Sequence, residues 1–201
     1  MENLNDPWST QKAKSVHFYK EVFNKDISFE GVKIPEYTKE FSVLGYIDRS
    51  ITGRTMLQVY REFFNFGSGS PVHNNDFSEN EFFTNLDKLI RKQQMRPSGN
   101  YAFAHVGGIE PEGIHLNKSY NTFCNDGNNH MIPIEGVMYA LQYRFENHDM
   151  IDVKYSTLYH ALDIKSRVIY MSAFNGQLGL FWGDRGKAIP SYGYRQIKLA
   201  A

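Results

Sequence analysis

Two runs of strand-forming residues lie close together near the C-terminal end, and this feature most restricts what the chain can fold into. Residues 153–163 (VKYSTLYHALD) and 167–174 (RVIYMSAF) are rich in β-branched and aromatic residues, and the short connection IKS separates them. Such spacing is typical of a β-hairpin. The sequence therefore predicts two antiparallel strands here, with residues 178–182 (LGLFW) as a third strand.

Helical periodicity dominates the first part of the chain. Residues 6–23 begin with a capping aspartate and a proline at a tolerated first position, and an apolar stripe follows. Residues 54–64 place apolar side chains at the spacings of an amphipathic helix, with Ser50 or Thr52 as the cap. Residues 76–92 open with a capping box and a hydrophobic staple. We therefore expect a helix in each of these three ranges.

The remaining segments complete the expected fold class. Residues 101–123 suggest short strands and turns, and residues 124–130 a polar loop. Residues 136–145 (GVMYALQYRF) are compatible with a buried strand or with a helix. The chain shows no repeat and no interdomain linker, so residues 1–201 are expected to form a single α+β domain, with antiparallel sheets layered with helices.

Composition excludes several classes of partner. With 22 basic and 22 acidic residues the chain lacks the positive field that binding to nucleic acid or to an anionic membrane requires. No apolar run approaches the roughly 20 residues of a membrane span, and the polar start has no signal-peptide pattern. We expect a soluble protein that binds neither nucleic acid nor membrane, and the sequence assigns no compartment. The single cysteine excludes an internal disulfide and a multi-cysteine zinc site.

One segment resembles a known enzyme family. In DRSITGRTMLQVY, the residues Asp48, Ser50, Arg54 and Tyr60 precede or enter an apolar helix, as in choloylglycine hydrolases and related linear amide carbon–nitrogen hydrolases. Residues 155–175 are similar to the late β-hairpin of that family, and the helix expected around FFTNLDKLI falls where the family has one. The two patches cover about half of the chain, and the region between residues 91 and 152 does not match.

This resemblance implies a fold and a chemistry. It implies the N-terminal-nucleophile architecture, in which two antiparallel sheets are sandwiched between helical layers. Members of the family cleave small amide substrates through an N-terminal cysteine whose own amine is the base. The family's active-site arginine corresponds to Arg54, where a guanidinium can stabilise the negative charge that develops during acyl transfer.

The chain departs from the family at the nucleophile. It begins with Met1 and Glu2, and its one cysteine is Cys124. Three interpretations follow: a later part of a split or processed enzyme whose partner chain carries the nucleophile, an inactive relative, or an accidental likeness. The alternative function is a noncatalytic α+β binding or assembly protein, for which self-association stays open.

Histidines supply the other candidates. Cys124 is close in sequence to Asp126 and His130, so a thiol–imidazole pair is one hypothesis for catalysis, and a small buried apolar residue is the alternative. His115, His130 and Asp126 match no zinc signature, so we expect no metal site, and no cofactor motif is present. His105 alternates with apolar residues, which indicates a hydrogen-bonded histidine of a sheet and not a base.

Overall fold

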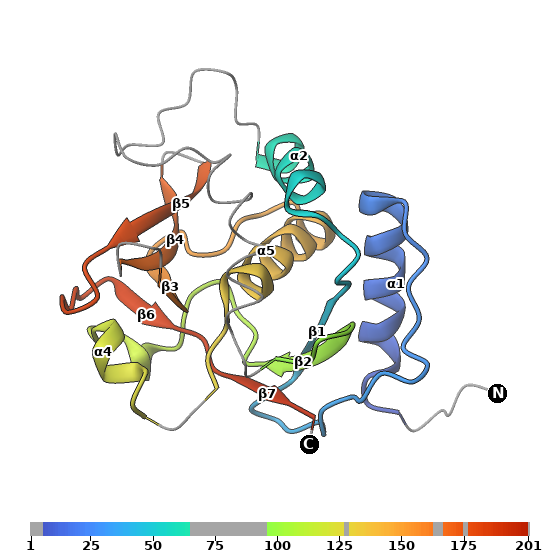
Figure 1. Ribbon diagram of the computed structural model, residues 1–201, viewed down its shortest axis with the longest axis horizontal. Helices are drawn as coiled ribbons and strands as arrows, with labels where there is room; N and C mark the ends of the chain where they lie inside the picture. Colours follow the sequence, from blue (N-terminus) through green and yellow to red (C-terminus); the bar gives the residue numbers. More distant parts are fainter. Residues whose placement is uncertain (1–5, 65–95, 127–128, 163–166, 175–176, 201) are drawn as a thin grey trace.

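The computed structural model describes residues 6–64, 96–126, 129–162, 167–174 and 177–200 (Figure 1). The helix expected at 76–92 and the connection at 164–166 lie outside these residues. The first part contains α1 (Ser9–Phe23), β1 (Val43–Ile47), α2 (Gly53–Phe64) and β2 (Tyr101–His105). After these come a 3-10 turn (Gly113–His115), α4 (Tyr120–Phe123), α5 (Pro133–Asn147), β3 (Ser156–Leu162), β4 (Val168–Phe174), β5 (Gln177–Gly183), β6 (Tyr192–Tyr194) and β7 (Ile197–Leu199).

The fold belongs to the α+β class, as predicted. Among the described residues, one sheet has the strand order β1-β2-β7 and the other β5-β4-β3-β6. Strands β3, β4 and β5 are consecutive antiparallel neighbours, which confirms the predicted hairpin and its third strand. The short strand β6 pairs with β3 in parallel, so the second sheet is mixed. Strands β6 and β7 were not predicted. They are short, and each depends for its backbone hydrogen bonds on the neighbouring strand with which it pairs.

Helix α5 lies between the two sheets (Figure 1). It contacts β1 on one side and β3 on the other, while α1 lies along the outer edge of β1 and also contacts α5. The side chains of β2 alternate between two clusters: Ala102 and Ala104 pack with Trp8 and Leu44, whereas Phe103 belongs to the core cluster that includes α5. Strand β2 is therefore buried on both faces.

The N-terminus of α5 is fixed by a buried carboxylate. Glu135 is fully buried and accepts hydrogen bonds from the Ile132 backbone N–H at 2.8 Å, from the Tyr101 hydroxyl at 2.8 Å and from the Arg96 Nε at 2.6 Å. Pro133 occupies the first turn, where its missing N–H is not needed. These contacts, which sequence periodicity does not reveal, decide that the ambiguous segment 136–145 is helical.

The prediction for residues 113–123 was wrong. This segment forms a 3-10 turn and the short helix α4, and no strand. The physical reason is local: the Ser119 Oγ accepts the Thr122 backbone N–H at 3.3 Å, which starts a helical turn.

A separate observation concerns membranes: within the described ranges, no helix combines the length and the apolar character needed to span a bilayer.

A buried arginine joins the two sheets. Arg195 lies between β6 and β7, and only 1% of its side chain is exposed. Its guanidinium donates to Asp152 at 2.8 Å, to the Thr157 Oγ1 at 3.2 Å, and to the backbone oxygens of Gly108 and Ile109 at 3.1 and 3.0 Å. One side chain thus connects β3, the segment after β2 and the segment before β3.

We predict that Arg195→Met lowers the free energy of unfolding by about 3–5 kcal/mol, because it leaves Asp152 as an uncompensated buried carboxylate. Urea unfolding followed by circular dichroism measures the change. Lys187→Met, at an exposed position, is the matched control and should stay within about 0.5 kcal/mol of the parent protein. Equal stability of the two variants would contradict the role given to Arg195.

A second prediction concerns the contact of α5 with β3. A Cβ placed on Gly136 would overlap the ring of Tyr159, so Gly136→Ala should destabilise the protein by about 1–3 kcal/mol despite the higher helix propensity of alanine. Gly99→Ala provides the control, since nothing lies within 4 Å of its added Cβ. Thermal unfolding of both variants gives the comparison, and a stabilised Gly136→Ala protein would show that the two elements do not approach this closely.

Candidate functional site

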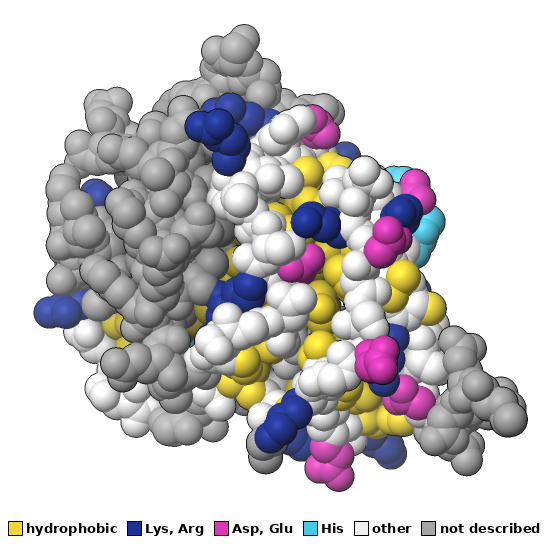
Figure 2. Space-filling model, turned by 45° about the vertical axis from the view of Figure 1, so that its right-hand side comes forward, with side chains coloured by type: hydrophobic (Ala, Val, Ile, Leu, Met, Phe, Trp, Pro, Cys, Tyr) yellow, Lys and Arg dark blue, Asp and Glu magenta, His cyan; other side chains and the backbone are white. Residues whose placement is uncertain are grey.

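A pocket opens between α1, β1 and α5. Its volume is about 340 Å³, near the lower end of the range of about 300–1,000 Å³ found for small-molecule sites. Figure 2 shows this side of the molecule, where hydrophobic side chains are exposed between rows of polar and charged ones. The helix α5 contributes one face, with lining residues at helical spacing: Met138, Tyr139, Gln142, Tyr143, Glu146 and Asn147.

The outer edge of β1 borders the pocket, and α1 covers part of that edge. The Gln11 side chain accepts the Leu44 backbone N–H at 2.6 Å and donates to the Ser42 backbone oxygen. The Tyr19 hydroxyl donates to the Tyr46 backbone oxygen at 2.6 Å. Side chains therefore occupy the edge groups that an added β-strand would use, which protects the edge.

An ion pair between two helices lies at the pocket mouth. The Lys14 Nζ is 2.9 Å from a carboxylate oxygen of Glu146, and the Gln142 side chain donates to the other oxygen at 2.7 Å. The Lys14 side chain is 54% exposed, so the pair contributes little to stability. Its two charges cancel, and the mouth has no fixed excess charge from them.

His105 belongs to the pocket lining and is fully buried. Its ring meets the Tyr139 ring edge to face at a centroid distance of 4.3 Å, and the Tyr139 hydroxyl donates to the Gly108 backbone oxygen at 2.9 Å. The His105 Nδ1 is 3.1 Å from the Val106 backbone oxygen, whereas Nε2 has no hydrogen-bond partner. Burial lowers the His105 pKa to about 3, and the nearby Arg195 adds to this effect, so the ring is neutral at physiological pH.

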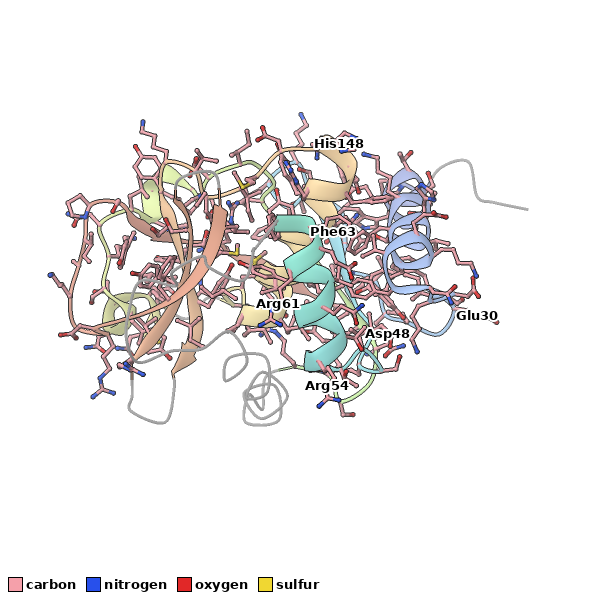
Figure 3. All side chains as sticks on the ribbon, turned by 90° about the horizontal axis from the view of Figure 1, so that it is seen from above. Glu30, Asp48, Arg54, Arg61, Phe63 and His148 are labelled. Atoms are coloured by element: carbon pink, nitrogen blue, oxygen red, sulfur yellow. The ribbon has the colours of Figure 1, made fainter. Side chains whose placement is uncertain are left out.

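Arg54 lies outside this pocket. It is exposed in the first turn of α2, and Figure 3 shows it at the end of that helix, directed away from the core. The preceding residues form a helix start: the Asp48 carboxylate accepts the Ser50 N–H at 2.8 Å, and the Thr52 Oγ1 accepts the Thr55 N–H at 3.2 Å. The catalytic role of Arg54 stays a prediction. The contacts of this helix start do not bring a nucleophile or another reacting group to Arg54.

Cys124 follows α4 on the face of the second sheet that is turned away from α5. It packs beside the buried cluster of Phe123, Leu158, Val168 and Tyr194. Burial raises the pKa of its thiol, and the Tyr120 hydroxyl is its side-chain hydrogen-bond partner. The thiol is therefore protonated at neutral pH, unlike the thiolate of an activated nucleophile. Figure 1 shows α4 and α2 on different parts of the molecule, so the fold does not bring Cys124 and Arg54 together.

The histidines near Cys124 form an aromatic network around Tyr194. The ring of His115 stacks on Tyr194 at 4.2 Å, and His130 meets the same ring edge to face at 4.5 Å. One Asp126 oxygen is 2.9 Å from the His130 Nε2, and the other accepts the Tyr194 hydroxyl at 3.2 Å. The carboxylate of Asp126 thus contacts the side chains of two neighbouring residues. In the described part of the chain, no three His, Cys, Asp or Glu residues are grouped to hold a metal ion.

Sequence reasoning missed the pocket because its lining residues come from α1, β1, β2 and α5, which lie far apart in the chain. Gly45 was one available signal, since an isolated glycine in a strand indicates close approach of another group. The structure gives the reason: a Cβ on Gly45 would overlap the Phe103 ring, and both residues line the pocket. His105 was recognised as a sheet histidine, and its Nδ1 contact agrees with that expectation.

We predict that Cys124 reacts slowly with iodoacetamide at pH 7 and that its alkylation rate rises steeply only at pH values above 9, because burial raises its pKa above the ordinary value of 9.0. Cys124 is the one cysteine of the chain, so mass spectrometry follows this site alone. Glutathione under the same conditions is the control. Alkylation faster than glutathione at pH 7 would instead support the thiol–imidazole hypothesis.

Comparison with known proteins supplies no relative for this arrangement. The chain matches no protein-family model, no curated protein and no solved structure. The likeness to choloylglycine hydrolases therefore rests on the two sequence patches alone, and the function has to be inferred from the pocket.

Proposed function

We propose that this protein is a noncatalytic binding protein that takes up a small organic molecule in the pocket between α1, β1 and α5. The observation that carries the proposal is the pocket itself: a cavity of about 340 Å³ whose lining combines apolar residues such as Val43 and Met138 with the polar residue Gln142. Concave, largely apolar sites with a few polar groups are the usual form of ligand pockets.

The edge of β1 favours a small molecule over a peptide strand. A peptide that extended the sheet would need the backbone groups of Ser42, Leu44 and Tyr46 that Gln11 and Tyr19 already occupy. Displacing these three hydrogen bonds would cost free energy, whereas a compact ligand in the pocket leaves them intact.

The amide-hydrolase hypothesis has less support. It requires a nucleophile beside Arg54, and the first turn of α2 offers capping contacts of Asp48 and Thr52 instead. Helix α5 between the two sheets adds no support for the sandwich that the resemblance implies. Incubation with a panel of acyl amides, comparing the parent protein with Arg54→Ala, tests this hypothesis directly; turnover that Arg54→Ala abolishes would establish it and overturn a noncatalytic role.

The binding proposal predicts that small aromatic fragments of about ten heavy atoms bind the protein and that Gln142→Trp abolishes this binding. Gln142 lines the pocket and is partly exposed, so a larger side chain narrows the space without disturbing the core. Saturation-transfer NMR with a fragment mixture, followed by titration of the strongest binders, measures the effect.

Gln58→Trp provides a closely matched control. Gln58 lies exposed on α2 and donates to Glu62, four residues later, just as Gln142 donates to Glu146. The control should bind fragments like the parent protein. Binding that survives Gln142→Trp, or the absence of any bound fragment, would refute the proposal.

A further inference from the structure

Two side chains of opposite charge line the pocket, one from each helix that borders it. Lys14 comes from α1 and Glu146 from α5, and among the described lining residues these are the two that carry a charge, since the ring of His105 is neutral. The Lys14 side chain is 54% exposed and the Glu146 side chain 20%. Both charged groups are therefore open to solvent at the pocket mouth, where an entering ligand meets them.

Neither side chain uses its full hydrogen-bonding capacity within the described part of the chain. The Lys14 ammonium has three N–H donors and directs one to Glu146 at 2.9 Å. The Glu146 carboxylate has about four acceptor positions, of which Lys14 takes one and the Gln142 side chain another. Donors of Lys14 and acceptors of Glu146 thus remain for a ligand, and the ion pair need not separate to offer them.

The ion pair favours a ligand that carries both signs of charge. A lone carboxylate would be attracted by Lys14 and repelled by Glu146, whose oxygen lies only 2.9 Å from the ammonium, and a lone ammonium would meet the reverse. A ligand with both groups can direct its carboxylate to Lys14 and its ammonium to Glu146, so that each charge has neighbours of opposite sign. Charge-assisted hydrogen bonds of this kind are stronger than those between neutral groups.

The accessible part of the remaining lining fits an apolar ring. Val43, Tyr139 and Tyr143 line the pocket and are only partly buried. The two tyrosine rings meet edge to face at a centroid distance of 6.1 Å, an arrangement that a further ring can extend. Removal of an aromatic ring from water against these side chains would supply affinity that the exposed charges alone cannot.

Resting on the proposed binding function, we propose that the ligand is a zwitterion: a small molecule with an ammonium and a carboxylate group at one end of an aromatic body. An α-amino acid with an aromatic side chain is the simplest member of this class. Lys14 then recognises the carboxylate and Glu146 the ammonium, while Val43, Tyr139 and Tyr143 contact the body.

Phenylalanine, 2-phenylethylamine and 3-phenylpropanoate are matched probes, because they share the ring and its linker and differ in the charged groups they carry. We expect phenylalanine to bind the parent protein about tenfold more tightly than either singly charged probe, as measured by NMR titration. Lys14→Met should remove its advantage over 2-phenylethylamine, since the carboxylate loses its partner. Glu146→Gln should remove its advantage over 3-phenylpropanoate, since the ammonium loses its partner.

Two exposed residues outside the pocket lining provide matched controls. Lys20 also lies on α1, is 48% exposed and is 2.9 Å from the carboxylate of Asp26. Glu62 on α2 accepts a hydrogen bond from the side chain four residues earlier, as Glu146 does. Lys20→Met and Glu62→Gln should keep the preference of the parent protein for phenylalanine over both singly charged probes.

The outcomes separate the two proposals. If uncharged 3-phenylpropanamide binds the parent protein as tightly as phenylalanine, and Gln142→Trp abolishes the binding of both, the pocket function holds and the zwitterion inference is overturned. A preference for phenylalanine that persists in both Lys14→Met and Glu146→Gln would also overturn it, because the charges of the probe would then be recognised elsewhere. If no probe binds, the pocket function fails and the inference fails with it.

Discussion

The guanidinium of Arg195 is the interaction on which the arrangement of this protein depends. A charge this deeply buried is tolerable only when its donors are satisfied, and Asp152, Thr157, Gly108 and Ile109 provide the acceptors. Asp152 adopts a left-handed backbone conformation with φ of 56°, and burial raises its pKa to about 6. The left-handed backbone conformation and the buried carboxylate of Asp152 both cost free energy. They are tolerated here because the same contacts hold the two sheets together.

The hydrogen-bond network of Arg195 is connected to the pocket through the segment after β2. Gly108 accepts hydrogen bonds from both Arg195 and the Tyr139 hydroxyl, which places the Tyr139 ring against His105. The charge of Arg195 also helps to keep the His105 ring neutral. The network that connects the sheets thus also holds Tyr139, which lines the pocket.

Local sequence signals predicted helices and strands well where the whole signal lies within one short segment of the chain. Thr52 caps α2 as one of the two expected caps, and β3, β4 and β5 follow the predicted hairpin pattern. The signals failed for residues 113–123, where the cap at Ser119 outweighs strand propensity, and left residues 136–145 undecided. In the second case Glu135 decides the outcome through partners distant in sequence. Arg54 and Cys124 were chosen by resemblance and chemistry, and the structure places neither in the pocket.

By itself the sequence determined the α+β class, the hairpin near the C-terminal end and the even balance of charge, because propensity, periodicity and composition are properties of short segments or of the whole composition. Only the tertiary structure decided where the pocket lies. Its walls come from residues 10 to 147, and the close approaches at Gly45 and Gly136 exist only once the elements have packed. The state of His105 is decided in the same way, since its neutrality and its unsatisfied Nε2 result from burial beside Arg195 and Tyr139. No local pattern encodes burial of this kind.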